Sequence, residues 1–165
     1  LIGKELDHPI FTQSVRARVI ARIQQAPIRP GVVSLLEDAR AKGIPCVVAS
    51  SSKHVWVDGH LARLGLTDYF QFTCCSDDVE RAKPFPDLYL LASSKLGFDP
   101  KECLALEDSP NGTAAAVAAG IFVIAVPNSV TAQLDLSHAN HRIETLEGET
   151  TSSLQAIRDA LQHHK

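Results

Sequence analysis

Three short polar segments stand where a predicted strand gives way to a predicted helix. They are residues 50–53 (SSSK), residues 81–87 (RAKPFPD) and residues 107–109 (EDS). In an open parallel sheet, ligands bind beyond the carboxyl ends of the strands. Side chains with hydroxyl, ammonium and carboxylate groups at such ends could bind a phosphate and a metal ion, so these segments hold the candidate site residues.

The first segment has the chemistry of an anion site. Backbone amides at the start of a helix attract anions, the hydroxyls of Ser50, Ser51 and Ser52 add donors, and Lys53 adds a positive charge. Phosphate binding is therefore one interpretation. The alternative is that a serine only caps the helix, because serine is common at the N-cap position.

The acidic segment has the chemistry of a hard-cation site. Glu107 and Asp108 are adjacent carboxylates at the end of an apolar run, where they repel each other and are costly to desolvate. A Mg²⁺ ion would offset both effects with the oxygen ligands it prefers. The alternative is that Asp108 or Ser109 caps a helix beginning at Pro110.

The middle segment fixes a lysine on a rigid turn. Pro84 and Pro86 restrict the chain just after Lys83 and just before a helix. A lysine held in this way can act as a fixed point charge for an anion. The alternative is an ordinary solvated surface lysine.

The elements that carry these segments follow from the hydrophobic pattern. Apolar runs at 44–50, 70–75, 103–107 and 121–126 predict strands, and a short edge strand is expected at 141–146. Helices are expected at 10–26, 32–42, 53–64, 86–96, 110–119 and 152–162. Strands that are apolar throughout and alternate with helices indicate an α/β fold, a parallel sheet covered on both faces. The composition changes near Pro30, so residues 1–29 are expected to belong to a different substructure from the rest of the chain.

Composition narrows the function classes. The 165 residues are 45% hydrophobic and 21% charged with a net charge of −3, which is typical of one soluble domain. Neither nucleic acid nor an anionic membrane is an expected partner, and no apolar stretch is long enough to span a bilayer. The four cysteines lie in apolar runs, which predicts buried, reduced thiols and a cytoplasmic location, and no Cys/His spacing is typical of a zinc site.

Taken together and in this order, the three segments resemble the haloacid dehalogenase (HAD) superfamily. The blocks VVASSSK, KPFPDLYLLA and CLALEDSPNGTAAAVAAG, followed by AVPN, are similar to the subgroup of β-phosphoglucomutase and small sugar-phosphate phosphatases. The resemblance implies a three-layer, Rossmann-like core over residues 30–165. Residues 1–29 would be the C-terminal part of an α-helical cap.

The resemblance also implies roles. Ser50 would hydrogen-bond the transferring phosphoryl group, Lys83 would neutralise the nucleophile and the phosphate, and Asp108 would bind Mg²⁺ with Glu107 as a second ligand or its partner. Ser51 belongs to the same phosphate-binding segment, and Ser52 and Lys53 match positions that hold a second phosphate in the mutase.

One feature of that family has no counterpart here. Its nucleophile belongs to an Asp-x-Asp motif after the first strand, which lies between the strands ending at Ser50 and Glu107, and no apolar run in this chain ends in Asp-x-Asp. We therefore expect an inactive fragment of a magnesium-dependent phosphatase that acts on small phosphorylated metabolites, sugar phosphates foremost, through an aspartyl-phosphate. The alternatives are a phosphosugar mutase and a non-catalytic phosphate-binding module. The sequence does not predict the oligomeric state.

Overall fold

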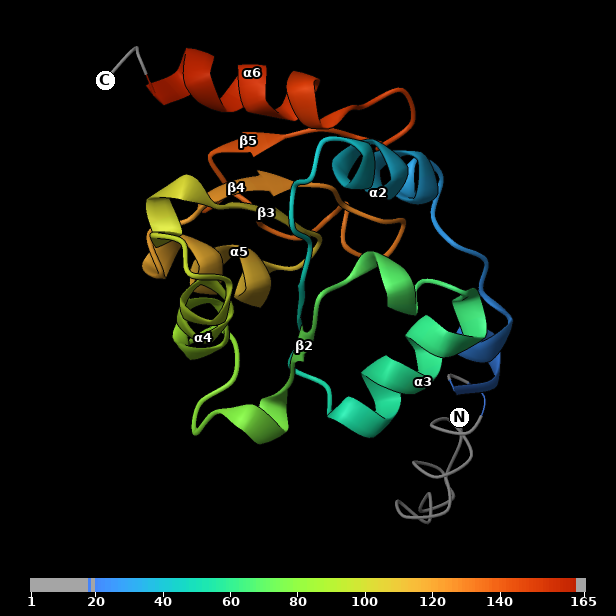
Figure 1. The fold of residues 1–165 in the computed structure, drawn as a ribbon. Coiled ribbons are helices and arrows are strands. Elements are labelled where there is room, and N and C mark those ends of the chain that lie inside the picture. The colour runs from blue at the N-terminus through green and yellow to red at the C-terminus, as the bar shows by residue number, and fades with distance from the viewer. Residues whose placement is uncertain (1–17, 19, 163–165) are drawn as a thin grey trace, which may run out of the picture.

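The computed structural model describes residue 18 and residues 20–162 (Figure 1). Its α-helices are α2 (Val32–Ala41), α3 (His54–Leu64), α4 (Asp87–Leu96), α5 (Pro110–Ala118) and α6 (Thr151–Gln162). Its strands are β1 (Val48–Ala49), β2 (Thr73–Cys74), β3 (Leu104–Glu107), β4 (Phe122–Ala125) and β5 (His141–Arg142). Three single turns of 3₁₀-helix are η1 (Thr67–Tyr69), η2 (Ser76–Asp78) and η3 (Pro100–Glu102). Residues 20–25 are also helical, while the rest of the helix predicted at 10–26 lies largely outside the described residues.

All strand pairings are parallel, as predicted, but the strands form two sheets. One sheet pairs β1 with β2, and the other has the order β3-β4-β5. Within the described part of the chain, no strand joins β1 to β3. At the predicted strands 44–50 and 70–75, β1 and β2 have two residues each. The hydrogen bonds between the two segments run further, from Gln71 to Cys46 and from Ser50 to Cys74.

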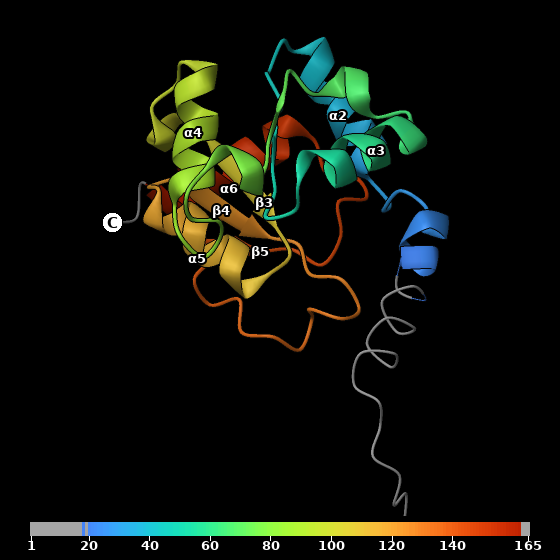
Figure 2. The ribbon, with the colours of Figure 1, turned by 90° about the horizontal axis from the view of Figure 1, so that it is seen from below.

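Helices cover both faces of the larger sheet. Val123 of β4 is fully buried in a cluster with Ala115 of α5, and a residue of α4 joins the same cluster. The next residue, Ile124, belongs to a second cluster with Leu35 of α2 and Leu154 of α6. Since successive side chains of a strand point to opposite faces, α4 and α5 lie on one side and α2 and α6 on the other (Figures 1 and 2). The predicted three-layer α/β fold is confirmed.

The cysteines match the expected reduced state. All four are free; Cys74 and Cys75 are buried, and Cys46 and Cys103 are half-buried. Burial raises the pKa of each of these thiols. In the described part of the chain, no helix is long and apolar enough to cross a membrane.

Candidate active site

Lys83 connects the two sheets. Its Nζ donates to the carbonyl oxygen of Ala49 at the end of β1 (2.9 Å) and forms an ion pair with Glu107 at the end of β3. Nζ also lies 3.3 Å from the hydroxyl of Tyr89 on α4. Only 10% of the Lys83 side chain is exposed. The solvated-lysine alternative is therefore wrong, and Lys83 is a fixed charge between two strand ends.

Glu107 has partners for both carboxylate oxygens. Lys83 and the hydroxyl of Tyr89 donate to Oε1, while Ser109 Oγ and the Asp108 amide lie 3.3 Å from Oε2. Burial, followed by the charge of Glu107, raises the pKa of Tyr89 above its usual range, so this hydroxyl keeps its proton and stays a donor. The counter-cation of Glu107 in this structure is Lys83.

The start of α5 is built around that carboxylate. Ser109 is the N-cap of the helix, and its Oγ accepts from the Gly112 amide at 3.1 Å. A Cβ at Gly112 would collide with the Glu107 carboxyl group. Glycine at this position therefore lets the buried carboxylate lie against the first turn of the helix.

Asp108 faces a different partner. Its Oδ2 accepts from Asn128 Nδ2 at 2.8 Å, and Asn128 Oδ1 in turn accepts from the amides of Val130 (2.8 Å) and Thr131 (3.1 Å). These bonds hold the Asn128 amide in one orientation. Within the described residues, Asp108 Oδ1 has no hydrogen-bond partner, so it can still bind a cation.

This donor set fits a magnesium ion. Mg²⁺ keeps several water ligands and is commonly held by one or two protein carboxylates. Asp108 offers a half-buried carboxylate oxygen at the strand end. The oxygens of Glu107 are engaged by Lys83 and its neighbours, which makes Asp108 the better ligand of the pair and Glu107 its supporting partner.

The serine segment forms a turn after β1. The Ser50 amide extends the β1–β2 ladder by donating to the carbonyl oxygen of Cys74 (2.8 Å), and Ser50 Oγ accepts from the Ser52 amide at 3.1 Å. Because that oxygen acts as acceptor, its own O–H is left to donate to a ligand. Ser51 and Lys53 are exposed and Ser52 is half-buried.

The serine-cap alternative is wrong for α3. The N-cap residue of this helix is Lys53, which makes no side-chain capping bond. The amide of His54 is instead satisfied by Asp77 Oδ1, 3.1 Å away on the turn after β2. The serines are therefore not needed to cap the helix.

Lys83 brings the predicted site segments to one edge. It contacts Ala49, which precedes Ser50, and Glu107, which precedes Asp108. The roles given to the site residues stay predictions. Sequence reasoning did not assign roles to three residues that support this edge: Tyr89, Gly112 and Asn128. Of the three, only Asn128 stands out in the sequence, because it ends the block AVPN after the strand predicted at 121–126.

Comparison of the sequence with known proteins assigns the chain to a family. The profile of the haloacid dehalogenase-like hydrolases matches residues 3–120. The chain belongs to the haloacid dehalogenase-like hydrolase family. "Putative phosphatase YhcW" of Bacillus subtilis is 46% identical over 145 residues, covering 88% of this chain and 66% of that protein. Hexitol phosphatase B of Escherichia coli K12 is 36% identical over 120 residues, covering 70% of this chain and 54% of the relative.

Solved structures of this family share the fold. CbbY from Rhodobacter sphaeroides, crystallised with phosphate, has a TM-score of 0.76 at 27% identity, over 92% of this chain and 70% of CbbY. The β-phosphoglucomutase of Clostridium difficile has a TM-score of 0.75 at 25% identity, over 87% of this chain and 63% of the mutase. The chain spans about half to two thirds of the length of the curated relatives it matches.

Proposed function

We propose that this chain supplies the phosphate- and metal-binding part of a magnesium-dependent phosphatase that acts on small phosphorylated metabolites. The observation that carries the proposal is the buried Lys83, which joins the end of β1 to the end of β3 beside Ser50 and Asp108. Phosphoryl transfer requires groups that stabilise negative charge on the phosphoryl oxygens. A cation, a hydroxyl donor and a carboxylate that can hold a metal ion meet this need at one sheet edge.

Each residue has a distinct task in this proposal. Lys83 neutralises charge on the phosphoryl oxygens, and the free O–H of Ser50 donates to one of them. Asp108 would hold Mg²⁺, which supplies positive charge next to the transferring group when bound. Glu107 and Tyr89 hold Lys83 in place, and the exposed Ser51 and Lys53 lie where the rest of the substrate would enter.

Sugar phosphates are the favoured substrates. Hexitol phosphatase B is a similar protein, and a variant of CbbY from R. sphaeroides was crystallised with xylulose-1,5-bisphosphate, with a TM-score of 0.74 and 29% identity to this chain. The similarity to β-phosphoglucomutase structures supports a mutase as the second candidate. In that case the exposed Lys53 would bind a distal phosphate.

We further propose that the nucleophile comes from a strand outside the 165 residues. What supports this is the division of the sheet: β1 pairs only with β2 and β3 only with β4 in the described part of the chain. Leu106 of β3, a strand otherwise inside the fold, is 37% exposed. A strand inserted between β1 and β3 would cover this side chain and complete one parallel sheet.

The test compares two proteins on an aryl phosphate and a panel of sugar phosphates. We expect the 165-residue chain to be inert, and the same chain preceded by the upstream segment of its gene to hydrolyse them in Mg²⁺. Lys83→Ala in the longer protein should lower kcat by about 100-fold or more, as the loss of one charge-stabilising group does. Turnover that requires a bisphosphate primer and isomerises the sugar phosphate would indicate the mutase. An inert longer protein would contradict both enzymes and favour a binding module.

A further inference from the structure

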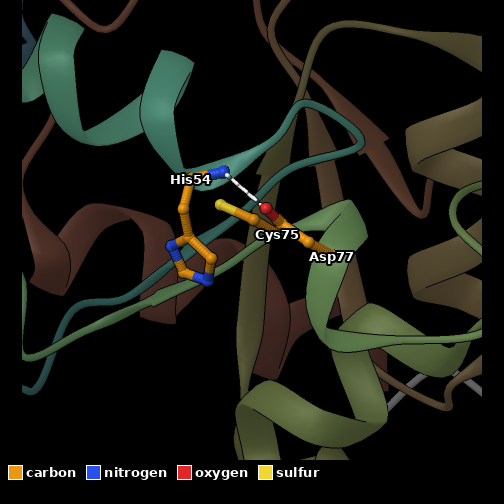
Figure 3. A group of neighbouring side chains, drawn as sticks. All are labelled: His54, Cys75 and Asp77. Atoms are coloured by element: carbon orange, nitrogen blue, oxygen red, sulfur yellow. Dashed lines mark hydrogen bonds between the residues drawn. The ribbon is translucent and has the colours of Figure 1, made fainter.

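A second group of ligand-type side chains lies where α3 begins (Figure 3). An imidazole nitrogen of His54, the sulfur of Cys75 and a carboxylate oxygen of Asp77 all lie within 4.8 Å of one another. In Figure 3 the Asp77 carboxylate is hydrogen-bonded to the backbone nitrogen of His54, and the Cys75 sulfur lies beside this bond. This group, which we call the His-Cys-Asp cluster, shares no residue with the site around Lys83 and Asp108.

The spacing suits a tetrahedral cation. Zinc bonds of about 2.0–2.1 Å to nitrogen and about 2.3 Å to sulfur place neighbouring ligand atoms roughly 3.3–3.8 Å apart. The cluster needs to contract by about 1 Å from its 4.8 Å limit to reach that range. Asp77 is exposed, so its side chain can move toward an ion, while the buried Cys75 offers a fixed point.

Asp78 already orients the imidazole. Its Oδ2 accepts from the Cys75 amide (2.8 Å) and lies 2.7 Å from His54 Nε2. A carboxylate only accepts, so Nε2 donates to Asp78 and Nδ1 is the ring nitrogen left for an ion. Nδ1 now lies 3.0 Å from Thr73 Oγ1 and 3.3 Å from the Asp58 carboxylate, so an ion bound there would replace any proton on Nδ1. A carboxylate behind a histidine in this way is the usual support of a zinc-bound imidazole.

The negative charges around the His-Cys-Asp cluster also favour a bound cation. Three carboxylates approach His54: Asp77 at the backbone amide (3.1 Å), Asp78 at Nε2 (2.7 Å) and Asp58 at Nδ1 (3.3 Å). These three negative charges around one small volume attract a cation. Asp58 or a water molecule could serve as the fourth ligand of a tetrahedral ion.

We infer that His54, Cys75 and Asp77 form a binding site for one Zn²⁺ or another thiophilic divalent cation. On binding, the S–H bond of Cys75 breaks, a sulfur–metal bond forms, and the proton passes to the solvent. Thiolate and imidazole ligands do not suit Mg²⁺, so the cluster discriminates against the ion assigned to Asp108. The bound ion would tie the start of α3 to the turn after β2, next to residues 50–53.

The experiment titrates the metal-free 165-residue chain with ZnCl₂ by calorimetry, in two buffers that differ in ionisation enthalpy. We expect one Zn²⁺ per chain with release of at least one proton. Cys75→Ser and His54→Gln should each weaken binding by at least about 10-fold. The matched controls Cys46→Ser, a half-buried free cysteine, and Asp108→Asn should bind as the unchanged chain does.

Cobalt gives a second readout that is independent of activity. Co²⁺ bound by a thiolate shows a sulfur-to-metal charge-transfer band, which should appear in the unchanged chain and disappear in Cys75→Ser. Circular dichroism checks that each variant folds. If Cys75→Ser does not fold, the exposed Asp77→Asn replaces it and must also weaken binding. The inference fails if neither ion binds, or if Zn²⁺ binds equally well without the Cys75 thiol and the Asp77 carboxylate.

Discussion

Replacing Glu107 with glutamine removes one charge from the buried pair and almost preserves the shape of the side chain. The Lys83 and Glu107 side chains are 10% and 8% exposed. The single amide oxygen of glutamine can still accept from Tyr89, while its NH₂ group would face the Ser109 hydroxyl and lose the 3.3 Å bond from the Asp108 amide. The main loss is the compensation of the Lys83 charge. Removing one partner of a buried pair costs about 3–5 kcal/mol. That is a large part of the roughly 5–15 kcal/mol by which a domain is stable.

Urea unfolding of the 165-residue chain measures this cost, followed by circular dichroism and by the fluorescence of Trp56, the single tryptophan. The matched control is Glu144→Gln, because Glu144 pairs with Arg142 at 3.0 Å but is 76% exposed. This surface pair should contribute less than about 1 kcal/mol. Adding Lys83→Met to Glu107→Gln should restore part of the stability, since no unpaired charge remains. Equal unfolding midpoints and m-values for Glu107→Gln and Glu144→Gln would refute the reasoning.

Three further predictions concern stability. Gly112→Ala should destabilise the chain by about 1–3 kcal/mol, because the added Cβ collides with Glu107. Gly59→Ala in the middle of α3, where a Cβ meets no other atom, should stabilise the chain by up to about 1 kcal/mol. Urea unfolding measures both changes. The Thr151 hydroxyl and the Lys42 ammonium hold the pKa of Asp38 at about 2. The contribution of the Asp38 carboxylate to folding stability is therefore fully present above its unfolded pKa of 3.8 and is lost as the pH falls through about 2. The Tm difference between the unchanged chain and Asp38→Asn should shrink between these two pH values. Arg29 donates to the carbonyl oxygens of Val126 (2.9 Å) and Pro127 (2.7 Å), so Arg29→Ala should cost about 1–2 kcal/mol, and the exposed Arg142→Ala less than half of that.

Much of the fold was predictable because apolar runs and glycine stops mark the elements directly. The helices predicted at 53–64 and 86–96 do end at Leu64 and Leu96, and each is followed by a glycine with positive φ, Gly65 or Gly97. The parallel α/β arrangement follows from the same pattern. Strand length was not predictable, because apolarity reports burial and does not report how many residues pair with a neighbouring strand.

The sequence predicted the residue types of the site better than the contacts between them. The strand ends with Ser50 and Asp108 and the turn with Lys83 were found from the sequence, but the alternatives for Lys83 could be separated only by burial. Its partner Glu107 is 24 residues away, and no local pattern joins them. The His-Cys-Asp cluster was missed for the same reason: His54 and Cys75 come from different elements and do not form a zinc-type spacing.

The helix α4 has a structural task that bears on how site variants are interpreted. Leu88 is fully buried in a cluster with Cys74 of β2, while the next residue, Tyr89, belongs to the cluster around Val123 of β4. One helix therefore packs on both sheets, and Lys83, just before it, adds a polar link between them. Variants of Lys83 and Tyr89 should lower both stability and activity. Leu154→Ala on α6 removes core packing on the opposite face of the larger sheet, in the cluster with Leu35 and Ile124. In the longer protein it gives the loss of activity that destabilisation alone causes, and only a larger loss in Lys83→Ala can be assigned to the chemistry.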